Sequence, residues 1–146
     1  MRELLFRGFH PCDCPDTIVV DGEKVKGKWV EGSLLTYKDG TTFVCCEDYI
    51  PDVLNKYEVL LSTVGQSTGL TDRTGKRIFE GDILKTNKYG KDDGKGHNFA
   101  GPDAFCVAFE DGGYCLRNEW RRFNLRPDID AEVIGTVFDE EAQHDN

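Results

Sequence analysis

One segment constrains the fold more than any other: residues 63–85, with the sequence TVGQSTGLTDRTGKRIFEGDILK. Four glycines recur in it at intervals of four to six residues, namely Gly65, Gly69, Gly75 and Gly81. Glycine at this density fixes a backbone path, because it tolerates positive φ and the close approach of two chains. We therefore expect at least two of the four to have positive φ. The apolar side chains expected to be mostly buried are Val64, Leu70, Ile78 and Ile83.

Short strand patterns separated by turn signals run along most of the chain. Asp21-Gly22 and Asp39-Gly40 separate apolar runs over residues 18–20, 28–37 and 41–46, which predicts a three-stranded meander. Further strands are predicted over residues 3–9, 58–64, 77–80, 83–86, 104–110, 114–117 and 132–138. Residues 104–110 are apolar on both faces, which indicates burial on both sides.

Other stretches predict turns or helix. Residues 10–16 hold two prolines and two aspartates and are expected to form a turn or loop. Residues 47–57 and 118–124 favour short helical turns. Residues 88–103 are polar and glycine-rich, typical of a long loop that is either functional or mobile.

These patterns together predict a mainly β fold. We expect a small barrel or pseudo-barrel of short antiparallel strands with one or two short helical segments. A length of 146 residues suits a single domain over residues 1–140, followed by a frayed tail over residues 141–146.

The charge of the chain is negative but unevenly distributed. A formal net charge of −9 opposes non-specific binding to the phosphates of nucleic acids. Residues 73–95 nevertheless carry seven basic and four acidic side chains, and residues 117–126 carry four arginines and one glutamate. Either stretch is a candidate for a local basic face.

The six cysteines are expected to be free thiols in the cytoplasm. Residues 1–10 lack the apolar core of a signal peptide, and no stretch approaches the ~20 apolar residues that span a membrane. Thiols stay reduced in the cytosol. The pattern His10-Pro-Cys12-Asp-Cys14 has zinc-binding atoms, but neither Cys-x-Cys nor the adjacent Cys45-Cys46 has the spacing of a zinc site. We therefore expect no metal and no cofactor.

Four blocks of the sequence resemble the YopX-like family of phage and prophage proteins, and they occur in the expected order. They are residues 1–8, residues 28–34, the segment 63–83 and residues 133–138. The most specific positions lie in the third block, at Gly65, Gln66, Gly69, Leu70, Asp72, Gly75, Ile78, Glu80, Gly81, Asp82 and Ile83. Residues 88–103 look like an insertion relative to the family, and the cysteines are not part of its pattern. The resemblance implies a mainly β fold, a phage or prophage origin and self-association, and it carries over no catalytic residue.

Candidate catalytic groups have weak spacing. Glu80 and Asp82 flank Gly81 and would share a face of a strand, as an acid–base pair requires. The alternative, which we favour, is that an acidic residue beside a tight turn accepts backbone hydrogen bonds. A cysteine nucleophile would need a histidine such as His97, and no spacing supports one. We expect no catalytic residue.

Aromatic and arginine residues alternate near the C-terminus, at Arg117, Trp120, Arg121, Arg122, Phe123 and Arg126. Such a patch is suited to stacking bases and neutralising phosphates. The alternative that we favour places Trp120 and Phe123 against the core, with the arginines facing water or pairing with acids.

The sequence therefore favours a non-enzymatic binding or assembly module that acts through protein–protein contacts. We expect it to form a homo-oligomer, through residues 104–110 or the Trp120 and Phe123 pair. The alternatives are a nucleic-acid-binding accessory domain and, with the least support, a small hydrolase or metal-dependent enzyme. No membrane contact is expected.

Overall fold

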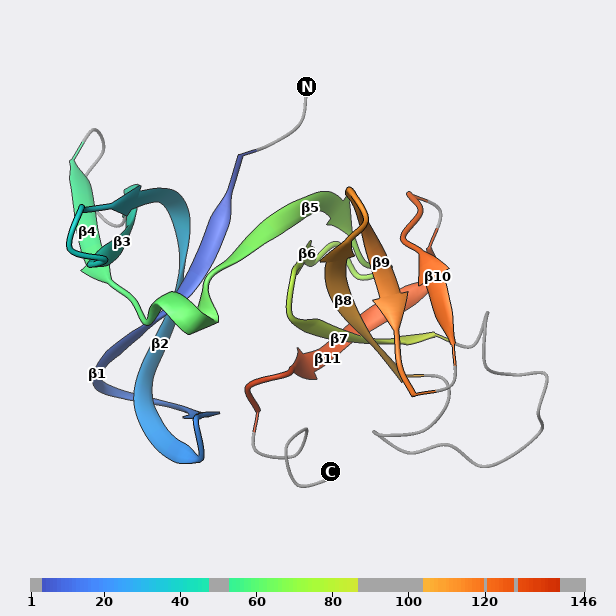
Figure 1. Ribbon diagram of the computed structural model, residues 1–146, viewed down its shortest axis with the longest axis horizontal. Coiled ribbons are helices and arrows are strands. Elements are labelled where there is room, and N and C mark those ends of the chain that lie inside the picture. The colour runs from blue at the N-terminus through green and yellow to red at the C-terminus, as the bar shows by residue number, and fades with distance from the viewer. Residues whose placement is uncertain (1–3, 48–52, 87–103, 120, 128, 140–146) are drawn as a thin grey trace. The chain divides into compact units, whose positions relative to one another are not determined.

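The computed structural model describes residues 4–47, 53–86, 104–119, 121–127 and 129–139 (Figure 1). Within them lie eleven strands and one three-residue 3-10 helix, so the mainly β prediction is confirmed. The strands form two antiparallel sheets, with the orders β4-β3-β2-β1-β5-β6 and β10-β9-β8-β7-β11. No closed barrel is found among these residues, because each sheet ends in strands with one neighbour. The barrel stays a prediction.

The chain divides into two compact units, Met1–Ser67 and Thr68–Asn146. The strand β5 (Gly65–Thr71) begins in the first unit and ends in the second. Each unit is described by itself below. A single domain over residues 1–140 stays a prediction, and the predicted tail over residues 141–146 lies outside the described residues.

The first unit is a meander of four strands followed by a 3-10 turn. Its elements are β1 (Phe6–Val20), β2 (Glu23–Thr36), β3 (Thr42–Glu47), β4 (Leu54–Glu58) and η1 (Leu61–Thr63). Asp21 and Gly22 join β1 to β2 with φ of 53° and 82°, the positive values that a two-residue hairpin turn needs. The predicted meander is confirmed.

The long β1–β2 hairpin contains a bulge opposite Gly27. Pro11 and Asp16 both lie opposite Gly27, so residues 12–15 have no partner residue on β2. A Cβ on Gly27 would lie 2.1 Å from the backbone oxygen of His10, which makes glycine necessary there. The predicted loop over residues 10–16 is therefore wrong in part: the strand continues, and its proline-rich stretch forms the bulge.

The core of the first unit forms around Val30, Val44 and Val59. Phe9 is fully buried and meets Trp29 edge to face at 5.2 Å between ring centroids. The chain after β4 returns to β1, where Leu60 N–H donates to the Phe9 oxygen and Phe9 N–H donates to Thr63 Oγ1, both at 3.0 Å. These bonds hold η1 and explain why the predicted strand over residues 58–64 is wrong.

The second unit contains the remaining strands. They are β6 (Arg77–Phe79), β7 (Asp82–Thr86), β8 (Ala104–Glu110), β9 (Gly113–Arg117), β10 (Arg122–Asn124) and β11 (Ala131–Thr136). Its core is formed by Ile78, Leu84, Phe105, Val107, Leu116, Ile129 and Ala131. Asp111 and Gly112 turn β8 into β9 with φ of 54° and 82°.

Two helical predictions are wrong within the described residues. Residues 54–58 form β4, which pairs with β3 from Phe43↔Glu58 to Glu47↔Leu54. Residues 122–124 form β10, whose Phe123 lies opposite Leu116 and contacts Phe105 edge to face at 5.8 Å. In both cases pairing with a neighbouring strand overrides a short local preference. No helix of the described residues is long and apolar enough to cross a membrane.

Candidate functional site

The glycine-rich segment adopts the expected backbone. Gly69, Gly75 and Gly81 have φ of 83°, 94° and 92°, which confirms the prediction of at least two positive values. Among the four apolar side chains, Ile78 and Ile83 are buried, while Val64 and Leu70 are half-buried.

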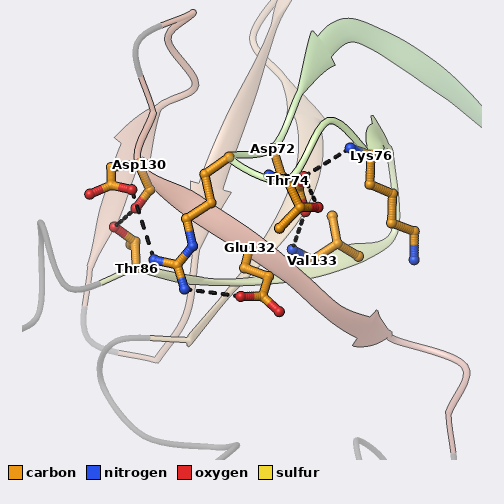
Figure 2. A network of polar contacts seen from close by, with 8 residues as sticks. Asp72, Thr74, Lys76, Thr86, Asp130, Glu132 and Val133 are labelled. Atoms are coloured by element: carbon orange, nitrogen blue, oxygen red, sulfur yellow. Dashed lines mark hydrogen bonds and ion pairs between the residues drawn. The ribbon is translucent and has the colours of Figure 1, made fainter.

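Asp72 is the polar centre of this segment (Figure 2). Its buried carboxylate accepts hydrogen bonds at Oδ1 from Thr74 N–H, Thr74 Oγ1 and Lys76 N–H, at 2.9, 2.7 and 2.9 Å. Oδ2 accepts a bond from Val133 N–H at 2.9 Å. Burial raises the pKa of this carboxyl, but the hydrogen bonds from Val133, Thr74 and Lys76 outweigh it and leave the pKa below its ordinary value. The Asp72 carboxylate therefore holds the backbone of the 74–76 turn and of β11 in place.

A small open cavity of about 390 Å³ lies beside this network, lined by Arg73, Lys85, Glu132 and Ile134. The Arg73 guanidinium meets Glu132 at 2.9 Å and Asp130 at 3.8 Å. Lys85 is the register partner of Glu132. The lining carries two cations and one carboxylate, and Asp130 adds a second carboxylate beside Arg73, so these formal charges balance and give little attraction for an anion.

Of the two carboxylates beside Gly81, Asp82 has a place in the fold that the structure shows. Asp82 is fully buried, and its Oδ2 accepts a hydrogen bond from Phe79 N–H at 2.8 Å. A carboxylate closed off from solvent and bonded to backbone cannot reach a substrate. Glu80 is half-buried on the preceding turn. The geometry of Asp82 fits the structural interpretation.

Two of the four arginines of this patch, Arg117 and Arg122, are paired with acids. The Glu110 carboxylate forms ion pairs with Arg117 and with Arg122, whose Nε lies 3.1 Å from Glu110 Oε1. Arg122 Nη2 also lies 3.6 Å from Asp111 Oδ2. The hydrogen bonds from Arg117 and Arg122 lower the pKa of Glu110. An open groove of about 430 Å³ is lined by Glu110, Arg117, Asn118, Glu119, Arg121 and Arg122.

Of the other predicted members, the two that the structure describes do not line this groove. Phe123 is half-buried against Phe105, while Arg126 is exposed. Trp120 lies outside the described residues, as do positions 87–95 of the other basic stretch. The aromatic residue that can be placed therefore serves the core.

Cysteine and histidine residues form no group of three metal-binding side chains in the described part of the chain. His10 Nδ1 lies 2.7 Å from the Glu58 oxygen. His97 and His144 lie outside the described residues. All six cysteines are described, and none is bonded to another.

One surface was not predicted from the sequence: the outward face of β2, β3 and β4. Lys56 Nζ donates to the Tyr37 hydroxyl at 3.0 Å and lies 4.9 Å from the Phe43 ring centroid. Tyr37 and Phe43 meet edge to face at 5.5 Å. The hydrogen bond to Tyr37 raises the pKa of Lys56, so its ammonium is charged at neutral pH.

Exposed leucines extend this cluster. Leu35 lies opposite Phe43 in the register, and Leu54 lies two positions before Lys56 on the same face of β4. Exposed fractions are 38% for Leu35, 44% for Tyr37 and 63% for Leu54, and the register places Leu54 opposite Glu47, at the other end of β3 from Leu35. We call these five residues (Leu35, Tyr37, Phe43, Leu54 and Lys56) the β2–β4 face. The core of the unit lies on the other face, which carries Val44 and Tyr57.

The β2–β4 face escaped sequence reasoning because its members come from three strands. Tyr37 falls just after one strand, and Leu54 and Lys56 belong to a segment predicted as helical. The alternation of Leu54, Lys56 and Glu58 along the strand was the available signal.

Comparison with known families gives one result. The family described as YopX protein matches residues 19–142, which is most of the chain. No curated protein matches the chain.

Proposed function

The chain belongs to the YopX protein family, and we propose that it is a non-enzymatic assembly module whose β2–β4 face binds a second copy of the chain. The observation that carries this proposal is the cluster of exposed Leu35, Tyr37 and Leu54 around Lys56. Aromatic and large apolar side chains gathered at the centre of a patch are the composition of protein interfaces. Exposed apolar residues grouped in this way indicate a binding surface more strongly than the same residues scattered singly.

The charges of this face favour a second copy as the partner. Lys56 is its cation, and Glu47 and Glu58 stand on the same side of β3 and β4. A two-fold axis through the face brings Lys56 of one copy toward the carboxylates of the other. Closed two-fold dimers bury a self-complementary patch in this manner. The net charge of −9 opposes association, so the contact should strengthen as salt screens the repulsion.

We place the self-association contact outside the segments that the sequence favoured for it. The strand β8, predicted from its two apolar faces, lies between β7 and β9 and has no open edge. Phe109 is exposed but meets Tyr114 edge to face at 5.0 Å. The β2–β4 face offers a larger group of exposed apolar side chains, and we place the contact there.

We also propose that the protein has a phage or prophage origin and acts in the cytoplasm. The resemblance of residues 63–83 to phage and prophage proteins supports a phage or prophage origin. The six thiols fit a reducing compartment such as the cytoplasm.

The alternative functions have less support. Nucleic-acid binding requires free cations, and Arg117 and Arg122 are paired with Glu110. A hydrolase or metal-dependent enzyme requires accessible catalytic groups, and Asp72 and Asp82 are both bonded to backbone N–H groups. Protein–protein contact requires only exposed side chains, and the β2–β4 face has them at Leu35, Tyr37 and Leu54.

Light scattering across a micromolar concentration series, at moderate salt, tests the proposal. The wild-type mass should rise toward about twice 16.5 kDa, and Leu54→Asp should hold it near 16.5 kDa. Leu61→Asp is the matched control, since Leu61 is equally exposed in the same unit but lies on η1. A wild-type mass near 16.5 kDa throughout, or equal loss in both variants, would overturn the proposal.

A further inference from the structure

The cavity beside β7 and β11 has walls that the Asp72 network holds in place. The Asp72 carboxylate accepts the Val133 N–H at 2.9 Å, and the Arg73 N–H donates to the Ala131 oxygen at 2.9 Å. These two bonds fix the 72–73 backbone against β11. The side chains next to the bonds line the cavity of about 390 Å³, and they are Arg73, Glu132 and Ile134.

A bulge in β11 supplies the apolar wall of this cavity. Val133 lies opposite Leu84 and Gly135 lies opposite Ile83, so Ile134 has no partner residue on β7. Bulges of this kind change the direction in which a side chain points. Ile134 is half-buried and lines the cavity. An aliphatic group bound there would therefore be covered on one side.

The charged side chains around the cavity alternate in sign. Lys85 lies opposite Glu132 in the register of β7 and β11, and register partners project to the same face of strands about 4.8 Å apart. The Arg73 guanidinium lies 2.9 Å from Glu132 and 3.8 Å from Asp130. Thr86 Oγ1 donates to the Asp130 oxygen at 2.8 Å, which holds the Asp130 backbone on β7. The cavity therefore presents an ammonium and a carboxylate side by side, without a net charge.

We propose that this cavity binds a free aliphatic α-amino acid. The carboxylate of the amino acid lies at Lys85, its ammonium lies at Glu132, and its side chain covers Ile134. A zwitterion carries both charges on one carbon and so matches two opposite charges on neighbouring strands. A singly charged ligand would be attracted by one of these groups and repelled by the other. The volume of the cavity is in the range of small-molecule pockets.

This binding site lies in the second unit and is independent of the self-association proposed for the first unit. Its failure would leave the β2–β4 face untouched. A titration of the full chain, labelled with nitrogen-15, with L-leucine and with glycine tests it by nuclear magnetic resonance. The backbone amides of Arg73, Lys85, Glu132 and Ile134 should shift and saturate, with a Kd for L-leucine of about 1 mM or tighter. Glycine should bind about tenfold more weakly, because it has no side chain to cover Ile134.

Two further probes separate the charges of the ligand on the wild-type chain. The anion 4-methylpentanoate is leucine without its ammonium group, and L-leucinamide has the ammonium without the carboxylate. Each should bind at least about tenfold more weakly than L-leucine, because each loses one charged hydrogen bond. Equal affinity for L-leucine and either probe would overturn the proposal. So would shifts that map outside the four lining residues, or no saturable shift at about 10 mM L-leucine.

One pair of variants tests the role of Lys85. Lys85→Met should weaken L-leucine binding about tenfold, because the methionine keeps the length of the side chain and removes its charge. Lys76→Met makes the same charge change on the turn that Asp72 binds, outside the cavity lining, and should bind as the wild type does. Circular dichroism confirms that both variants are folded. An equal loss of affinity in the two would contradict a contact at Lys85.

Discussion

Asp72 and Val133 lie 61 positions apart in the sequence, and the Asp72 carboxylate accepts a hydrogen bond from the Val133 N–H at 2.9 Å. The same carboxylate binds the turn formed by Thr74 and Lys76. One side chain therefore joins the turn before β6 to the strand β11 within the second unit. Asp72 lies within residues 63–83, the segment that carries the most specific part of the family resemblance.

Asp72→Asn should lower the free energy of unfolding by about 2 kcal/mol, because the amide has one accepting oxygen where the carboxylate has two. The lowered pKa of Asp72 gives stability that is present above the unfolded value, about 3.9, and is lost as pH falls through the folded pKa. The variant should therefore show a flatter loss of stability below pH 4 in urea titrations. Asp39→Asn is the control, since Asp39 caps the exposed turn at Thr41 and should change stability much less.

Gly27→Ala should destabilise the first unit by about 3 kcal/mol, because the added Cβ meets the His10 backbone oxygen at 2.1 Å. Gly113→Ala is the matched control, since no atom lies within 4 Å of its added Cβ, and it should stay within about 0.5 kcal/mol. Denaturant unfolding of both variants measures the difference. Equal stability of the two would contradict the close packing of β1 on β2.

Glu110→Gln should increase affinity for a single-stranded oligonucleotide, because Arg117 and Arg122 lose the carboxylate that pairs with them. The slope of log affinity against log salt should steepen by about 0.7 for each arginine that engages a phosphate. Glu119→Gln makes the same charge change in the same groove without removing a bond to these arginines. Identical anisotropy curves for the two variants would show that pairing with Glu110 does not restrain the patch.

Local chemistry made much of the fold predictable. Asp21-Gly22 and Asp111-Gly112 mark hairpins because both residues of each turn need positive φ. The predicted strand over residues 104–110 matches β8. Gly69, Gly75 and Gly81 likewise mark positive φ where the segment turns.

The misassigned segments depend on contacts that the sequence does not show locally. Val53, Leu54 and Tyr57 have helical spacing, yet residues 54–58 pair with β3. The prolines at 11 and 15 predict a loop, but they fall where β1 bulges opposite Gly27. Lys56 and Tyr37 are 19 positions apart, and only the pairing of β3 with its two neighbours brings them together. The β2–β4 face could not be assembled without that pairing.

Photo-crosslinking tests the central proposal most directly. A benzoylphenylalanine placed at Leu54 of the purified full chain should give a covalent dimer on irradiation, and the linked peptide of the second copy should fall within residues 29–58. The same group at Leu61, exposed on η1, should give little dimer. Crosslinks that are absent at Leu54, equal at the two positions, or mapped outside residues 29–58 would contradict binding through the β2–β4 face.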